Sequence, residues 1–154
     1  MKIFSLLTVF ATPLLFSNCR ETRQKMTVAR QEVAAAGDVT FAKKTFESLA
    51  KGDSSVSTKI DWPVFTSLGE NLGASYVALS SDVEKQKLIS SFITQFSVSF
   101  RESGGSVDAY TNWRVVSHDS QKTEVAADSS GGALTVMVSE RDGVEKISSI
   151  NVVK

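Results

Sequence analysis

The sequence has very little of the side chains that build metal centres and disulfide networks. Its 154 residues include one cysteine, Cys19, and one histidine, His118. Disulfide frameworks and thiolate zinc sites need several sulfurs, and histidine-rich metal clusters need several imidazoles, so these classes are excluded. We therefore expect no metal and no cofactor, and Cys19 needs a different explanation.

An excess of charge of one sign is also lacking. The chain has 17 basic and 17 acidic residues and a formal net charge of zero. No overall field would therefore attract nucleic acid. The sequence also has no nucleophile elbow, phosphate-binding glycine loop or metal-spaced carboxylate cluster. We predict that the protein does not bind nucleic acid and is not an enzyme.

A third feature in short supply is an apolar run long enough to cross a bilayer. The charge-free run Ile3 to Phe16 has 14 residues and contains Pro13, whereas a spanning helix needs about 20 apolar residues. The run follows the positively charged Met1-Lys2 and leads through a short polar step to Cys19. This layout is typical of a bacterial export signal.

The residues Phe16-Ser17-Asn18-Cys19 resemble the lipobox of bacterial lipoproteins, in which cleavage occurs just before a cysteine that receives diacylglycerol. The usual pattern has Leu three residues before the cysteine and Gly, Ala or Ser just before it. Phe16 and Asn18 make this a relaxed version, which is typical of spirochaetes. Ordinary secretion with cleavage near Cys19, or an uncleaved anchor, are the alternatives.

The lipobox resemblance implies how the first part of the chain is used. It implies a signal peptide over 1–18, acyl chains such as palmitate on Cys19, and a tether over 19–37 that is a weak helix or has no fixed structure. The protein would be exported and attached to a membrane of the cell envelope through its acyl chains. Arg20 is not the Asp that marks inner-membrane retention, so the outer membrane is favoured.

Two amphipathic helices are predicted after the tether. The first runs over 38–52, with Asp38 as its amino-terminal cap and Gly52 at its carboxyl end. The second follows Ser81 and Glu84, which match a capping box, and ends before Gly104. Between them we expect a short helix that begins at Asp61-Trp62-Pro63 and a short strand over 76–79.

The chain from Ser106 onward changes to short alternating runs that are separated by turn residues such as Ser-Ser-Gly-Gly and Arg-Asp-Gly. This spacing predicts about four antiparallel strands with one apolar face. Helices followed by a strand meander indicate an α+β domain over 38–154, with the helices packed on one side of a curved sheet.

The order of these elements resembles the NTF2-like superfamily, also called SnoaL-like cones. Two weak motifs support the resemblance: Phe-x-x-Leu-x-x-Gly-Asp over 46–53, and Asp142-Gly143 followed by Lys146-Ile147. It covers about 38–152, and there is a more distant likeness to periplasmic phospholipid-binding proteins. The resemblance implies the fold alone, because such cones include isomerases, dehydratases, carriers and interaction modules.

Our prediction for function is a non-catalytic binding or interaction domain, with a protein partner in the envelope or, for a pathogen, in the host. Trp62 and Phe65 could form an exposed aromatic anchor for such a partner. The first alternative is a carrier of a lipid or another apolar small molecule in the cone cavity. The residues that would line this cavity are Phe92, Phe96, Phe100, Trp113, Val136 and Val138.

A ketosteroid-isomerase-like enzyme is the second alternative. That chemistry uses a carboxylate base and a Tyr or protonated Asp that stabilises an enolate. The weak acid/base candidates are Asp108, Tyr110 and His118, with Asp108 and Tyr110 expected on the same side of a strand. His118 and Asp119 lie in a stretch with the composition of a hairpin turn, which is the simpler explanation for them.

Overall fold

The structure is a computed structural model that describes residues 36–119 and 121–153. The chain divides into two units, Met1–Val33 and Ala34–Lys154, and only the second is described below. The predicted signal peptide, Cys19 and the tether up to residue 35 lie outside the described residues. Within the described part of the chain, no helix combines the length and apolarity needed to cross a bilayer.

The first described helix, called α1 here, covers 36–51 and buries one apolar face. Ala42, Phe46 and Leu49 are almost completely buried. Gly52 ends the helix as predicted: its φ is +76°, and its N–H donates to the carbonyl of Leu49 at 3.0 Å. The prediction that Asp38 caps the helix is wrong, because residues 36 and 37 are already helical.

The segment between the two long helices contains the short helix predicted at Asp61-Trp62-Pro63, as a 3-10 helix, but otherwise differs from the prediction. It contains the 3-10 helices η1 (Ser54–Lys59) and η2 (Trp62–Val64), strands β1 (Thr66–Ser67) and β2 (Glu70–Asn71), and helix α2 (Leu72–Ala78). The strand predicted over 76–79 is therefore wrong. Trp62 and Phe65 are buried at 5% and 0% exposure, so they form no exposed anchor.

Helix α3 (Asp82–Glu102) is the longest helix, and its predicted capping box is confirmed. The Glu84 N–H donates to Ser81 Oγ at 3.2 Å, and Ser81 Oγ donates to the Glu84 carboxylate at 2.9 Å. Ile89 and Ile93 are buried along one stripe of the helix. The helix ends before Gly104, as the Gly-Gly pair predicts.

The carboxyl-terminal half forms the predicted meander after a short 3-10 helix, η3 (Val107–Ala109). Its strands are β3 (Thr111–His118), β4 (Lys122–Ser129), β5 (Gly132–Arg141) and β6 (Val144–Val153). These four strands pair antiparallel in sequence order. The sheet is larger than predicted, however, because β1 pairs parallel with β6 and β2 extends the edge, giving the order β2-β1-β6-β5-β4-β3.

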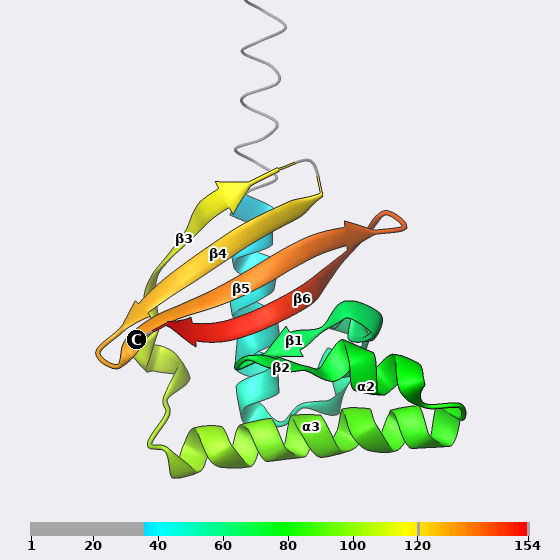
Figure 1. The fold of residues 1–154 in the computed structure, drawn as a ribbon. Helices are drawn as coiled ribbons and strands as arrows, with labels where there is room; N and C mark the ends of the chain where they lie inside the picture. Colours follow the sequence, from blue (N-terminus) through cyan, green and yellow to red (C-terminus); the bar gives the residue numbers. More distant parts are fainter. Residues whose placement is uncertain (1–35, 120, 154) are drawn as a thin grey trace, which may run out of the picture. The chain divides into compact units, whose positions relative to one another are not determined.

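The helices cover one face of this open mixed sheet, which confirms the α+β class. Figure 1 shows α1 crossing behind β4, β5 and β6, while α3 runs along the lower side. The core combines Phe46 and Leu49 of α1 and Ile93 of α3 with sheet residues such as Val136 and Ile150. Alternate residues of the central strands therefore face away from the helices.

Candidate functional site

The candidate site lies at the end of the sheet where two hairpins and the start of the described helix α1 meet. The β3–β4 hairpin ends near Lys122, and the β5–β6 hairpin turns at Asp142 and Gly143. Lys122 is paired with Ser139 of β5, so the two hairpins lie next to one another. Figure 1 shows the described start of α1 beside the β3–β4 hairpin.

Three side chains form a hydrogen-bonded chain at this end. Thr123 Oγ1 donates to Asp38 Oδ2, and His118 Nδ1 lies 2.7 Å from the same hydroxyl oxygen. Asp38 is only 8% exposed and Thr123 only 3%, whereas His118 is exposed. The carboxylate and hydroxyl are therefore buried, and the imidazole forms the accessible end of the chain.

The direction of these hydrogen bonds determines the tautomer of His118. A hydroxyl has one proton, and Thr123 gives that proton to Asp38. The contact with His118 therefore requires Nδ1–H to donate to the hydroxyl oxygen. In the neutral ring this leaves Nε2 as the proton acceptor. The hydroxyl itself is placed to orient the ring rather than to act as a nucleophile.

A small hollow, the end pocket, lies against this chain and has a volume of about 110 Å³. Carboxylates outnumber cations among its lining residues, which include Asp38, Glu140, Glu145 and Lys122. Burial, with added repulsion from the carboxylates of Asp38 and Glu140, raises the pKa of Glu145 above its ordinary value. The pocket therefore favours a protonated Glu145 more than water does.

Asp119, next to His118, has a local structural role. Its Oδ1 accepts the backbone N–H groups of Gln121 and Lys122, both at 2.8 Å. These bonds hold the pKa of Asp119 below its ordinary value. Asp119 therefore stabilises the β3–β4 turn, in agreement with the turn composition of this stretch.

A larger hollow, the outer groove, adjoins the end pocket and has a volume of about 500 Å³. The two hollows share Gln121, Lys122, Ser139 and Glu140 in their walls. Arg141 lies in the outer groove, where its Nη1 donates to Asp61 Oδ1 at 2.8 Å. The Asp61 side chain is 8% exposed and that of Arg141 is 50% exposed, so a buried carboxylate holds an accessible guanidinium.

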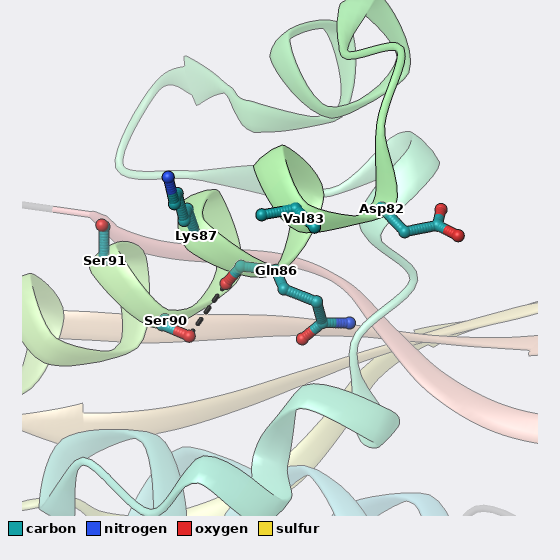
Figure 2. A pocket seen from close by; sticks show the side chains of 6 residues that line it. All are labelled: Asp82, Val83, Gln86, Lys87, Ser90 and Ser91. Atoms are coloured by element: carbon teal, nitrogen blue, oxygen red, sulfur yellow. Dashed lines mark hydrogen bonds between the residues drawn. The ribbon is translucent and has the colours of Figure 1, made fainter.

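A third hollow, of about 510 Å³, lies on the outer side of α3. Its lining residues are Asp82, Val83, Gln86, Lys87, Ser90 and Ser91. Figure 2 shows these side chains spread along the helix rather than directed at a common point, and Ser90 Oγ donates to the Gln86 carbonyl at 2.8 Å. This arrangement offers no convergent set of groups for chemistry.

The four aromatic residues predicted to line an apolar cavity are half-buried and pack against the core, where aromatic rings contact each other; they are Phe92, Phe96, Phe100 and Trp113. Phe46 packs against Phe100 and Tyr110 with ring centroids 5.7 and 5.0 Å away. Phe92 and Phe96 continue the row at 5.8 Å. We call these rings the aromatic layer; the full set is Phe46, Trp62, Phe65, Tyr76, Phe92, Phe96, Phe100, Tyr110 and Trp113.

Val136 and Val138, the other predicted lining residues, are 0% and 2% exposed in the same core. The acid/base candidates are not brought together. Asp108 is exposed in η3, and Tyr110 stacks on Phe100 at 6.3 Å before β3 begins. His118 lies at the far end of β3, eight residues along the chain, a separation of up to about 26 Å for an extended strand. Tyr110 and His118 therefore cannot act on one small substrate.

Sequence reasoning missed Asp38, Thr123 and Glu145 as site residues. Asp38 is an acidic residue near the start of a helix, and that pattern indicates a helix cap rather than a binding site. Thr123 and Glu145 carry no local signal at all. In the part of the chain that the structure describes, no three His, Cys, Asp or Glu side chains are grouped in a way that could hold a metal ion.

Comparison with protein-family models finds no matching family, and comparisons with curated proteins and with solved structures find no significant match. Function must therefore be argued from the chain itself. Two features of the chain bear on its function. One is the pattern around Cys19, and the other is the polar end of the sheet, where the end pocket and the outer groove meet.

Proposed function

We propose that the protein is a membrane-anchored envelope lipoprotein whose folded domain binds a partner without catalysis. The observation that carries the anchor is the position of Cys19, directly after a 14-residue charge-free run that is preceded by Lys2. Cleavage before Cys19 leaves a mature chain of 154 − 18 = 136 residues. Two or three acyl chains on one residue make attachment to a membrane stable, and the outer membrane is the favoured location.

The aromatic layer supports a binding domain over a carrier. A carrier needs free volume between the sheet and the helices, and in this domain rings occupy that region at centroid distances of 5.0 to 6.4 Å from Phe46. A domain of this size has little core volume to leave empty. The end pocket and the outer groove bring polar groups together at the end of the sheet, and this is where we place the binding surface.

The arrangement of helices and strands is the support for the proposal of an NTF2-like cone. Long helices α1 and α3 cover one face of a sheet whose four long strands follow them in the chain. The motif residues also have physical roles: Phe46 and Leu49 are buried, and Gly52 has the positive φ that ends α1. These roles do not depend on any activity of the superfamily.

The experiment compares the native chain with Cys19→Ser and with the matched control Ser17→Ala, each expressed in a bacterium with a lipoprotein pathway. We expect mass spectrometry of the native chain to show loss of 1–18 and an acylated Cys19, with the protein held in washed membranes. The Ser17→Ala variant should behave in the same way. The Cys19→Ser variant should carry no acyl chain and should be released without detergent.

An intact Met1 with a free Cys19 thiol would overturn the lipoprotein proposal. Detergent-free release of the full-length native chain would count against anchoring. If the domain still holds about one lipid molecule per chain after free lipid has been removed from the detergent sample, the carrier function would be favoured instead. These three outcomes test the anchor and the binding mode separately.

A further inference from the structure

We infer that the outer groove is a binding site for a small oxyanion that carries hydroxyl groups, such as a sugar phosphate or glycerol phosphate. Arg141 is the residue on which the inference depends. Its Nη1 contacts Asp61, and its other four N–H donors make no hydrogen bond with the described residues. A planar guanidinium with free donors is suited to bidentate contact with phosphate or carboxylate oxygens.

Asp61 makes Arg141 a positioned donor rather than a mobile surface side chain. The Asp61 carboxylate is buried, and its backbone N–H donates to the Ile147 carbonyl at 2.9 Å, which fixes Asp61 against β6. The 2.8 Å ion pair then holds one side of the guanidinium. The side chain of Arg141 therefore loses little additional entropy when it binds an oxyanion.

Hydroxyl groups on three strands line the outer groove: Thr66 of β1, Ser139 of β5, and Ser148 and Ser149 of β6. Thr66 of β1 is paired with Ser149 of β6, and Ser149 is paired with Met137 of β5. Ser149 Oγ accepts from Asn151 Nδ2 at 2.7 Å, which leaves its own proton to donate to a ligand. Ser139 and Ser148 Oγ donate to the carbonyls of Lys146 and Met137 at 3.4 Å, so they offer acceptor oxygens to a ligand. A set of hydroxyls that can both donate and accept suits a polyol.

A β-bulge explains why two consecutive serines, Ser148 and Ser149, both line the outer groove. The pairing of β5 with β6 shifts between Met137 and Val138, which are opposite Ser149 and Ile147, so Ser148 is the extra residue. A bulge changes the direction of side chains and breaks the strict alternation of a strand. Ser148 and Ser149 consequently both line the outer groove, on the face opposite the helices.

The charges and the size of the outer groove fit a phosphate that carries hydroxyl groups better than they fit a bare ion. Arg141 and Lys122 are matched by Asp61 and Glu140, so the groove has no net charge. Asp61 is already paired, and Glu140 can accept hydrogen bonds from ligand hydroxyls. A volume of about 500 Å³ lies in the range of small-molecule sites, and Val64 and Met137 offer apolar contact to carbon atoms.

This inference rests on the proposed binding function, because it names the class of ligand, but it does not need the lipid anchor. The ligand could be a soluble polyol phosphate or the headgroup of a lipid near the anchored domain. Both sources present the same chemistry to Arg141. The experiment therefore includes one arm for each source, and its result is independent of the state of Cys19.

The test is an NMR titration of the full-length chain in detergent micelles with sn-glycerol 3-phosphate, with glycerol and inorganic phosphate as reduced probes. A second arm measures binding of the Cys19→Ser chain to vesicles of phosphatidylglycerol in phosphatidylcholine. We expect saturable shifts in β5 and β6 with glycerol phosphate, or vesicle binding, and weaker effects with either reduced probe. Each probe is added up to about 10 mM, which exceeds the dissociation constant expected when one strong contact provides most of the binding energy.

Arg141→Lys keeps a cation beside Asp61, so the buried carboxylate stays paired, but it removes the guanidinium fork. We expect it to weaken binding about tenfold. The matched control is Arg114→Lys, because Arg114 also pairs with an aspartate, Asp128, at 2.9 Å but lies outside the groove. Equal losses in both variants, or no saturable binding in either arm, would overturn the inference.

Discussion

At the scale of single residues, one hydroxyl group links a buried carboxylate to an exposed imidazole. Thr123→Val keeps the shape of the side chain but removes both contacts. Asp38 then loses a buried hydrogen-bond donor, so we expect the free energy of unfolding to fall by about 1–3 kcal/mol. We also expect ¹⁵N NMR of the His118 ring to lose its preference for the Nδ1–H tautomer.

Thr135→Val is the matched control for this prediction. Thr135 lies on the neighbouring strand β5, is half-buried, and makes no side-chain hydrogen bond with the described residues. Its replacement should change the free energy of unfolding by less than about 0.5 kcal/mol. A Thr123→Val variant that keeps both its stability and the Nδ1–H tautomer would show that the chain of hydrogen bonds does not order the site.

Glu145 gives a pH-dependent prediction. Burial, and then the carboxylates of Asp38 and Glu140, raise its pKa above the ordinary value of 4.5. The folded state therefore holds the Glu145 proton more tightly than the unfolded state, so this residue lowers stability as pH rises through the raised pKa. Glu145→Gln should be more stable than the native chain at pH 7, and the gain should vanish below about pH 4.5.

The gain should be about 0.5 kcal/mol or less, because the burial of Glu145 in the end pocket is only partial: much of the residue stays exposed, and solvent screens the repulsion. Urea unfolding at several pH values measures it. Glu70→Gln is the control, because Glu70 is an exposed glutamate in edge strand β2 that does not line the end pocket, and it should show no such pH-dependent gain. A Glu145→Gln variant that is less stable than the native chain at pH 7 would contradict the prediction.

At the scale of elements, the contact of α2 with η2 depends on the absence of a side chain at Gly73. A Cβ there would lie 2.6 Å from the Pro63 carbonyl oxygen and 3.0 Å from the Phe65 nitrogen. Gly73 also donates its N–H to the Phe65 carbonyl at 2.8 Å. Gly73→Ala must separate the two elements, and we expect it to lower the free energy of unfolding by about 1–3 kcal/mol.

Gly37→Ala is the comparison for Gly73→Ala. Gly37 lies in α1, and a Cβ at this position would meet no atom within 4 Å. Because Ala favours a helix over Gly by about 1 kcal/mol, this variant should be more stable than the native chain. Chemical unfolding of both variants tests whether steric contact, rather than the loss of a glycine, determines the sign of the effect.

The elements that could be predicted from the sequence are those with local signals. The capping box at Ser81 and the glycine at position 52 mark helix ends through contacts within a few residues. Strands β1 and β2 have two residues each, and β1 exists because it pairs with β6 more than 80 residues later. Such pairing leaves no local pattern, so the sheet was predicted too small and fully antiparallel.

At the scale of the whole molecule, contacts between residues far apart in the sequence also explain why the candidate site was not predicted. Asp38 and Thr123 are 85 residues apart, and only the packing of α1 against the sheet brings them together. Local reasoning assigned Asp38 to a helix cap and His118 to a turn, since those are the roles that neighbouring residues suggest. The outer groove likewise combines β1, β5 and β6, whereas the pattern around Cys19 is entirely local and stays a prediction.

The aromatic layer gives a prediction for the whole molecule, because it determines whether the domain can contain an apolar ligand. Phe46 is 2% exposed and contacts four other rings. Phe46→Ala should lower the free energy of unfolding by about 3–5 kcal/mol and leave an apolar cavity. Benzene should then raise the melting temperature of the variant but not of the native chain, because it binds only where a dry cavity exists.

Val116→Ala, at a side chain that is 56% exposed on β3, is the control and should change neither stability nor benzene binding appreciably. A native chain whose melting temperature rises with benzene would have an apolar cavity before any mutation, and the carrier function would then be favoured over the binding domain. If only Phe46→Ala responds, the rings themselves fill the space, and the result supports the proposed binding surface at the polar end of the sheet over the carrier function.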